Sequence, residues 1–473
     1  MVIRANVRFR ISFISMTALL LCIQAPAQDR VNSDSKKYNV LFIAVDDLNT
    51  DLGCYGSSVV KSPHIDALAK NVVLFNRAYS QYPHCSPSRA SLLTGYKPDV
   101  TKVYNGDPDF RKTVPDVVTL PQLFKNNGYE TVRLGKIFHY GVPNQIGTNG
   151  ADDAASWSHV INPKGRDVSE KSKVIKLTPD RQMGSALAYH EADGKDGEQT
   201  DGIMATEAIR MLGRLKEQDK PFFLAVGFFR PHTPYVAPKK YFDLYTEEDI
   251  IIPAFDLEDV PSDALFTKPA NWGLSQDKLV AAKRGYYATV SFIDAQVGRV
   301  VDALKELGLA DNTIIVLWSD HGYNLGEHGQ WMKQSLFEKA VRVPLLFACP
   351  GNPPHIVDTP VELLDIYPTL AELAGLQPTQ KLDGKSLVPL LKNNTITDEK
   401  AAAFSQTKRG DRMGRSVRTK RWRYTEWDEG RSGVELYDHA VDDQELTNLA
   451  KDPEFKEIMS TLSKKLGDYY HSL

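Results

Sequence analysis

The sequence predicts an α/β protein with a large mixed, mostly parallel sheet sandwiched by helices and a smaller C-terminal α+β subdomain. Along the first 375 residues, apolar runs of strand length alternate with helical segments. This order is typical of a sheet covered by helices on both faces. Three of the apolar runs lead directly into Asp46-Asp47, Gly135-Lys136 and Ser319-Asp320-His321. Ligands of such folds bind beyond the carboxyl ends of the strands, so these polar residues are expected to converge.

The individual elements follow from apolar runs, helical periodicity and helix-ending glycines. Strands of the main sheet are expected at 38–45, 72–75, 130–134, 222–228, 313–318 and 343–348. Helices are expected at 65–70, 120–126, 202–217, 283–307 and 366–374. The C-terminal part should contain short antiparallel strands and a terminal helix, at 420–426, 434–437 and 455–470. Residues 141–200 are rich in Gly, Asp, Asn and Ser, and we interpret them as long, partly irregular insertions.

The first 27 residues have the parts of a secretory signal. A basic start precedes the apolar stretch 11–23, which is too short to span a bilayer comfortably, and small residues follow up to position 27. We expect an exported protein, periplasmic or secreted, with no stable membrane insertion after signal removal. A membrane anchor, or a lipid anchor at Cys22, is the alternative, but Leu21 is larger than the residue that normally precedes a lipidated cysteine. The predicted division is signal 1–27, main domain 28–375 and C-terminal subdomain 376–473.

Composition and net charge limit the classes of function that the protein can have. The chain has 473 residues, a net charge of −3, and hydrophobic and charged fractions of 42% and 25%. These are the values of a globular protein without a global field that would attract nucleic acid, so no nucleic-acid partner is expected. After signal removal the cysteines are Cys54, Cys85 and Cys349, and an odd number leaves at least one unpaired. A bridge between Cys54 and Cys349 remains open.

The segment 84–95 predicts a helix that begins at a cysteine. Pro87 suits the first turn, good helix formers follow it, and Gly95 can end the helix. Cys85 would lie at an exposed helix start, where the dipole favours anions, with Arg89 one turn further on the same face. A free cysteine beside a capped helix, or half of a disulfide, is the alternative.

The acidic residues predict a cation site. Asp46 and Asp47 follow one buried strand and Asp320 another, and His321 is next to it. An isolated Asp pair is more typical of a turn, but carboxylates at two strand ends suit Ca²⁺ or Mg²⁺. No Cys/His cluster has the spacing of a zinc site.

Basic residues predict a pocket for an oxyanion. Lys136 and His139 follow a strand, His232 lies in Arg-Pro-His-Thr-Pro, and Lys333 lies shortly after the acidic strand end. Taken singly, each is more typical of a solvated or structural group. Together with Arg89 they would form a cationic pocket opposite a metal ion. A tetrahedral oxyanion ester needs such charge neutralisation and a proton source for its leaving oxygen.

These motifs together resemble the type I, formylglycine-dependent sulfatases. Cys-Ser-Pro-Ser-Arg-Ala-Ser-Leu-Leu-Thr-Gly at 85–95 is similar to the signature of that family. Similar motifs occur in family order at 45–48, 135–139, 230–234 and 319–333. His after Asp at 320–321, where many sulfatases carry Asn, resembles the iduronate-2-sulfatase-like branch.

The resemblance implies the identity of the nucleophile and of the metal ligands. A formylglycine-generating enzyme would oxidise Cys85 to Cα-formylglycine, whose hydrate is the nucleophile. One Ca²⁺ ion, with Mg²⁺ as the alternative, would be held by side chains that include the matured cysteine, namely Asp46, Asp47, Cys85, Asp320 and His321. Arg89 would stabilise the hydrate.

The resemblance also implies the remaining roles. His232, aided by Lys333, would protonate or stabilise the leaving oxygen. Lys136 and His139 would hold the sulfate and assist its expulsion. The division of acid and base roles between the two histidines stays open.

The expected substrate is a sulfated oligosaccharide, with 2-O-sulfated uronic acid implied by the branch and algal polysaccharides such as ulvan, fucoidan or carrageenan as alternatives. Residues 97–115, 141–200 and 235–280 should shape the pocket. Because basic residues are local rather than spread along a groove, we expect action on a terminal sugar. Arg230, or a basic residue of 97–115, is expected to pair with a uronate carboxylate. Rival functions are a phosphodiester or phosphonate hydrolase of the alkaline phosphatase superfamily and a non-catalytic glycan-binding protein.

Overall fold

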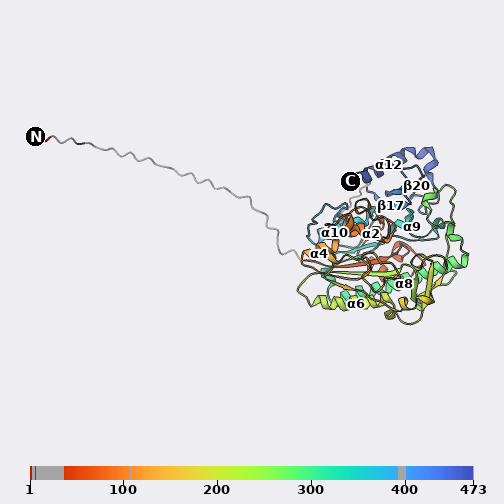
Figure 1. Cartoon of the computed structure of the whole chain (residues 1–473), viewed down its shortest axis with the longest axis horizontal. Helices are drawn as coiled ribbons and strands as arrows, with labels where there is room; N and C mark the ends of the chain where they lie inside the picture. The colour runs from red at the N-terminus through yellow and green to blue at the C-terminus, as the bar shows by residue number, and fades with distance from the viewer. Residues whose placement is uncertain (3–5, 7–36, 107–108, 393–400, 472–473) are drawn as a thin grey trace. The chain divides into compact units, whose positions relative to one another are not determined.

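An eight-stranded sheet forms the centre of the fold in a computed structural model (Figure 1). The model describes residues 1–2, 6, 37–106, 109–392 and 401–471, so nearly all of the predicted signal lies outside the described residues. The strand order is β15-β2-β14-β10-β1-β8-β4-β5. Their bounds are β1 Asn39–Asp46, β2 Val73–Phe75, β4 Glu130–Gly135, β5 His159–Ile161, β8 Phe222–Pro231, β10 Thr313–Ser319, β14 Leu345–Ala348 and β15 His355–Val357.

All strands of this sheet run parallel except β14, which is antiparallel to both of its neighbours. The mixed, mostly parallel sheet predicted from the sequence is thereby confirmed. The strand expected at 343–348 divides at Pro344, and β13 (Arg342–Val343) pairs in a small separate sheet with β3 (Ala78–Tyr79) and β16 (Val361–Glu362). Proline cannot donate a backbone hydrogen bond, which explains the break between β13 and β14.

Helices cover both faces of the sheet, because alternate side chains of each strand point to opposite cores. In β1, Leu41 and Ile43 belong to one hydrophobic core, and Val40 and Phe42 belong to the other. The first core lies under α1 (Pro63–Ala69), α6 (Thr200–Lys216) and α8 (Gln276–Glu306). The second lies under α2 (Cys85–Thr94), α4 (Leu120–Asn126) and α10 (Ile366–Leu373).

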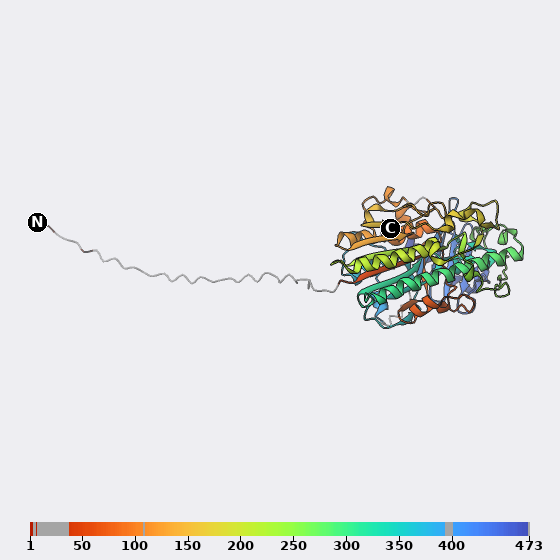
Figure 2. The same ribbon diagram turned by 90° about the horizontal axis from the view of Figure 1, so that it is seen from below.

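Figure 1 shows the sheet between these two layers, and Figure 2 shows the yellow-green α6 and the green α8 side by side on one face. Several further helices have one turn only: α3 Pro98–Thr101, α5 Arg166–Ser169, α7 Lys239–Phe242, α9 Glu338–Val341 and α11 Val388–Leu391. None of the helices in the described residues is long and apolar enough to span a membrane.

The segment 141–200 is more ordered than the sequence indicated. Besides β5 and α5 it contains β6 (Ile175–Lys176) and β7 (Ala188–Ala192), which form a three-stranded sheet with β9 (Tyr235–Pro238). The strands pair with a partner far along the chain, so local composition alone does not reveal them.

A four-stranded antiparallel sheet and the terminal helix α12 (Lys456–His471) form the C-terminal part. Its strands are β17 Ala403–Arg409, β18 Arg412–Arg418, β19 Trp422–Trp427 and β20 Val434–Asp438. Leu462 and Leu466 of α12 pack against Val417 and Leu436 of the sheet. The sequence predicted β19, β20 and α12 but missed β17 and β18, whose polar and basic residues hide the alternation. The boundary at residue 376 stays a prediction.

Close approach of two strand ends requires glycine at position 227. Gly135 of β4 is in register with Gly227 of β8 and has a φ of 65°. A Cβ atom at Gly227 would lie 2.1 Å from the carbonyl oxygen of Lys136. The backbone that carries Lys136 therefore rests directly on the glycine.

We predict that Gly227→Ala lowers the free energy of unfolding by about 1–3 kcal/mol, since backbone must move to admit the methyl group. Activity should fall with it, because Lys136 is displaced. The control is Gly213→Ala in α6, where a Cβ meets no atom within 4 Å. That substitution should raise stability by up to about 1 kcal/mol. Denaturant titration compares the two, and equal stabilities would contradict the steric explanation.

Candidate active site

The register of three neighbouring strands brings the predicted site residues together. Val45 of β1 pairs with Ser319 of β10, and Asp46 pairs with Pro231 at the end of β8. The residues that follow these positions, among them Asp47, Asp320 and His232, therefore meet at one edge of the sheet. The backbone N–H of Asp47 donates to Asp320 Oδ1 at 3.1 Å.

Hydrogen bonds from surrounding residues fix the turn after β1. Asp47 has a left-handed backbone with a φ of 64°, and the Tyr286 hydroxyl donates to its carbonyl oxygen at 2.8 Å. The N–H of Leu48 donates to Ser319 Oγ at 3.0 Å. Because these bonds hold the strained turn in one conformation, they also fix the direction of the Asp47 carboxylate.

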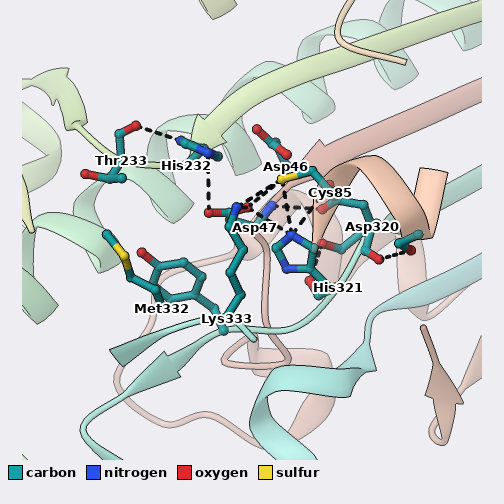
Figure 3. A network of polar contacts seen from close by, with 12 residues as sticks. Asp46, Asp47, Cys85, His232, Thr233, Asp320, His321, Met332 and Lys333 are labelled. Carbon is teal, nitrogen blue, oxygen red and sulfur yellow. Dashed lines mark hydrogen bonds and ion pairs between the residues drawn. The ribbon is translucent and has the colours of Figure 1, made fainter. Parts of the chain in front are cut away.

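Cys85 begins α2, and Gly95 with a φ of 75° ends it, as the sequence predicted. The expectation of an exposed helix start is wrong, because the Cys85 side chain is buried. Its Sγ lies 2.9 Å from Lys333 Nζ, 3.3 Å from His321 Nε2 and 3.6 Å from Asp47 Oδ1 (Figure 3). The strand-end residues cover the first turn of the helix, so Cys85 faces charged groups rather than bulk solvent.

Arg89 joins the two acidic strand ends from within α2. Its Nε donates to Asp320 Oδ2 at 2.8 Å, and its Nη2 lies 3.2 Å from Asp46 Oδ1. Its Nη1 donates to the carbonyl oxygens of Lys136 and Ile137. These contacts are with carboxylates and backbone rather than with Cys85, so the geometry makes Arg89 a support of the acidic cluster.

Lys136 and Lys333 contribute one ammonium group each to the same cluster. Lys136 Nζ donates to Asp46 Oδ2 at 2.6 Å, and Lys333 Nζ donates to Asp47 Oδ1 at 2.6 Å. Burial opposes the charge of Lys333, but Asp47 and Cys85 outweigh it and raise its pKa above the ordinary value. Burial raises the pKa of Asp46 to about 7 despite Lys136. Lys333 therefore brings a stable positive charge to Cys85.

The two histidines near Asp47 have defined tautomers. Nδ1 of His232 lies 2.7 Å from the carbonyl oxygen of Thr233, and Nδ1 of His321 lies 2.9 Å from that of Gly322. Since a carbonyl only accepts, each Nδ1 carries the proton and each Nε2 has a free lone pair. Burial lowers the pKa of both imidazoles. Both Nε2 atoms face Asp47, at 4.0 Å from His232 to Oδ2 and 3.3 Å from His321 to Oδ1.

This donor set fits a divalent cation. Asp46, Asp47, Cys85 and His232 form one group of closely spaced ligand atoms, and Asp47, Cys85, Asp320 and His321 form a second. Asp47 Oδ2 is buried and accepts no hydrogen bond from any described residue. A buried carboxylate oxygen without a partner is costly, and a metal ion would supply the missing one. Carboxylate oxygens are the ligands that hard cations prefer.

A pocket of about 450 Å³ opens above this cluster. Cys85, His139, His232 and Lys333 line it, together with residues of 141–145, 181–185, Gly106 and Phe266. All three segments expected to shape the pocket therefore contribute to it. The predicted residues therefore form two layers. The residues that line the pocket are its wall. The others form a charged floor beneath it, namely Asp46, Asp47, Asp320, Arg89, Lys136 and His321.

Two basic residues of the pocket were not predicted from the sequence, His84 and Arg181. His84 precedes Cys85, lines the pocket and has a buried Nδ1 without a hydrogen-bond partner among the described residues. Burial, with Lys333, lowers the pKa of His84 to about 3. The position of His84 next to the signature cysteine was a signal that could have indicated it. Arg181 lies in the aperiodic stretch 141–200, where no sequence pattern indicated a functional residue.

Arg230 does not line the pocket, contrary to the expectation that it pairs with a uronate carboxylate. It is buried, its Nη2 lies 3.1 Å from Asp167 Oδ2, and its Nη1 donates to the carbonyl oxygen of His232. Asp201 accepts from the backbone N–H groups of Phe229 and Arg230. Arg230 and Asp201 thus hold the loop that presents His232.

The C-terminal sheet supports the segments that border the pocket through β17. Arg409 Nη2 donates to the carbonyl oxygen of Gln334, the residue after Lys333. The N–H of Gln406 donates to the carbonyl oxygen of Gln81, and the N–H of Lys408 donates to the Tyr82 hydroxyl. β17 therefore fixes both the segment that leads into Cys85 and the segment that carries Lys333.

Three cysteines lie in the described residues, and all are free thiols. Cys54 and Cys349 are not bridged, so the pairing left open by the sequence is absent there. Cys85 differs from the other two by lying among charged side chains.

Comparisons with known proteins agree with this geometry. Residues 38–376 match the family described as Sulfatase, and residues 326–471 match that described as N-sulphoglucosamine sulphohydrolase, C-terminal. The chain is 35% identical to a "Sulfatase" of Formosa agariphila, covering 96% of this chain and 91% of that protein. It is 34% identical to the iduronate 2-sulfatase of Homo sapiens, covering 86% and 88%. The phosphonate monoester hydrolase of Agrobacterium radiobacter superposes with a TM-score of 0.76 and 26% identity, covering 92% and 96%.

The site combines a metal-suited acidic cluster at the strand ends with a central cysteine, and the family match over residues 38–376 identifies the protein as a hydrolase of sulfuric esters. The chain belongs to the sulfatase family. The family inferred from the motifs is confirmed.

We predict that Arg89→Met lowers the free energy of unfolding by about 3–5 kcal/mol, because it leaves two buried carboxylates without their shared partner. The control is Arg77→Met, which breaks an exposed pair with Asp358. That change should cost less than about 1 kcal/mol. Thermal unfolding followed by circular dichroism distinguishes them. If Arg89→Met unfolds at the wild-type temperature, the guanidinium does not hold the cluster together.

Proposed function

We propose that this protein is an exported sulfatase that removes sulfate from a sulfated glycan by means of a formylglycine made from Cys85. The observation that carries the proposal is the surroundings of Cys85 Sγ, with Lys333, His321 and Asp47 all within 3.6 Å. A buried thiol among so many polar groups is poorly suited to a packing role. The hydrate of an aldehyde at this position would supply an oxygen nucleophile beside a fixed positive charge.

The charged floor, together with Lys333 of the pocket wall, accounts for binding of an anionic ester. The carboxylates Asp46, Asp47 and Asp320 are matched in number by the cations Arg89, Lys136 and Lys333. With the imidazoles neutral, these charges cancel. A divalent ion held by Asp46, Asp47, Asp320 and His321, with the matured side chain, would leave an excess of positive charge for the sulfate and polarise its oxygens. Ca²⁺ is our first choice and Mg²⁺ the second.

The pocket wall supplies groups that hold and move protons. Lys333 is charged and 11% exposed, so its ammonium can donate to a sulfate oxygen or to the leaving oxygen. The free Nε2 of His232 can accept a proton, and its Nδ1 stays bonded to the Thr233 carbonyl. His139 lines the same pocket, and its buried Nδ1 has no hydrogen-bond partner among the described residues. We assign Lys333 as the proton donor and the two histidines as proton acceptors.

The substrate we propose is a 2-O-sulfated uronic acid at the end of an oligosaccharide. The likeness to iduronate 2-sulfatase over most of both chains supports this sugar. A pocket of about 450 Å³ walled by three separate segments supports action on a terminal residue rather than within a chain. Export and maturation by a formylglycine-generating enzyme complete the proposal. Algal sulfated polysaccharides remain the alternative source of substrate.

Hydrolysis of phosphonate monoesters or phosphodiesters is the second candidate. It is favoured by the superposition on the Agrobacterium radiobacter enzyme, which covers 92% of this chain. A monoanionic phosphonate monoester and a sulfate monoester carry similar charge, so the same pocket can accept both. Relative turnover of the two esters decides between them.

We predict that Cys85→Ala abolishes sulfate release while the protein remains folded, since removing one buried sulfur costs only about 1–2 kcal/mol. Mass spectrometry of the wild-type peptide should show the aldehyde in place of the thiol. The control is Cys54→Ala, a half-buried cysteine that does not line the pocket, which should keep full turnover. Normal turnover by Cys85→Ala would overturn the proposal, and faster turnover of a phosphonate monoester would favour the second candidate.

We predict that removing divalent metal lowers both activity and the melting temperature, because three clustered carboxylates lose a shared cation. Elemental analysis of the purified protein should find one ion per chain. Adding back Ca²⁺ or Mg²⁺ after chelation identifies the metal by the size of the recovery. An unchanged melting temperature, with no metal found, would require a different function for the acidic cluster.

A further inference from the structure

Arg181 is the cation of the pocket that the proposed reaction leaves unused. It lines the same pocket as Cys85 and is half-buried. Its guanidinium lies over the Trp272 ring, 4.5 Å from the centroid, and its Nε donates to the carbonyl oxygen of Ser185 at 2.5 Å. Both contacts restrict the plane of the guanidinium, so the group is already oriented before anything binds.

Arg181 has no acidic partner in the described part of the chain. The buried arginines of the site differ in this respect, since Arg89 pairs with Asp46 and Asp320, and Arg230 pairs with Asp167. Burial lowers the pKa of Arg181, and no carboxylate contributes to raising it. A guanidinium remains charged even so. Its Nη1 and Nη2 groups are therefore an unpaired fork of donors beside the pocket.

The rest of the upper pocket offers no second free charge. The other side chains contributed by 141–145 and 181–185 are uncharged, and they include Asn144, Gln145 and Gln182. Lys333, the other cation of the pocket wall, is committed to Asp47 and the Cys85 position. A ligand that carries two anionic groups would thus meet two separate cations, Lys333 beside Cys85 and Arg181.

We propose that Arg181 is a specificity-determining residue that binds a second oxyanion on the sugar whose sulfate ester faces Cys85. This inference rests on the proposed function. A carboxylate and a second sulfate ester share the required chemistry, because both accept two parallel hydrogen bonds from a guanidinium. Arg181 thus occupies the role that the sequence had led us to expect of Arg230.

The test measures binding separately from turnover. Three methyl glycosides of one 2-O-sulfated pyranose are compared, with a carboxylate, a hydroxymethyl group or a sulfated hydroxymethyl group at C5. Their Kd values are measured by calorimetry with Cys85→Ala protein, alone and combined with Arg181→Ala or Arg181→Lys. The matched control is Arg421→Ala, because Arg421 also lies over a tryptophan ring, Trp422 at 4.6 Å, but pairs with Asp438 in the C-terminal sheet.

We expect the charged glycosides to bind about tenfold tighter than the hydroxymethyl glycoside, as charge-assisted hydrogen bonds allow. Arg181→Ala should reduce this ratio to near one, Arg181→Lys should retain part of it, and Arg421→Ala should leave it unchanged. The charged glycoside with the larger affinity ratio over the hydroxymethyl glycoside identifies the anionic group that Arg181 binds.

A ratio that survives Arg181→Ala, or that is near one in the parent protein, would overturn the inference. Sulfate release by the unmodified enzyme is measured on the same three glycosides. Turnover without a charge-dependent ratio would remove the Arg181 assignment and keep the sulfatase. A charge-dependent ratio lost in Arg181→Ala, without any sulfate release, would keep the assignment and remove the proposed reaction. Arg181→Lys remains informative if Arg181→Ala does not fold.

Discussion

The buried bridge from Arg89 to Asp46 and Asp320 is the interaction on which the site depends. The two carboxylates lie at the ends of adjacent parallel strands, and neighbouring like charges repel one another strongly in a dry interior. A guanidinium supplied by the helix that begins at Cys85 balances them and ties that helix to the strand ends. Arg89 thus couples the position of Cys85 to the geometry of the acidic cluster.

The layered arrangement separates two tasks that compete for the same charges. The floor of Arg89, Lys136 and the acidic strand ends is fully buried, so its ion pairs are little screened by solvent. The wall of His139, His232 and Lys333 borders the pocket and can reach a substrate. Arg89 and Lys136 balance Asp46 and Asp320 within the floor, and Lys333 of the wall balances Asp47 while it borders the pocket.

Most of the sheet and nearly all residues of the charged cluster could be predicted from the sequence, and the reason is physical. Buried parallel strands are continuous apolar runs, and the polar residues at their ends, such as Asp46 and Asp320, mark the ligand edge. The sequence could not predict the burial of Cys85, which depends on distant strand ends closing over the helix. Nor could it distinguish Arg230 from Arg181, since each arginine's role is decided by whether a carboxylate such as Asp167 lies within reach.

The docking of β17 against residues 81–82 and Gln334 has a consequence for the order of synthesis. Translation releases the segment around Cys85 more than three hundred residues before the strand that fixes it. Until β17 emerges, the carbonyl oxygens of Gln81 and Gln334 lack the donors that it supplies, so the segments that lead into Cys85 and carry Lys333 are not yet fixed. Any enzyme that must reach this side chain has that interval in which to act. A translation product interrupted before β17 therefore lacks the contacts that hold these pocket segments in place.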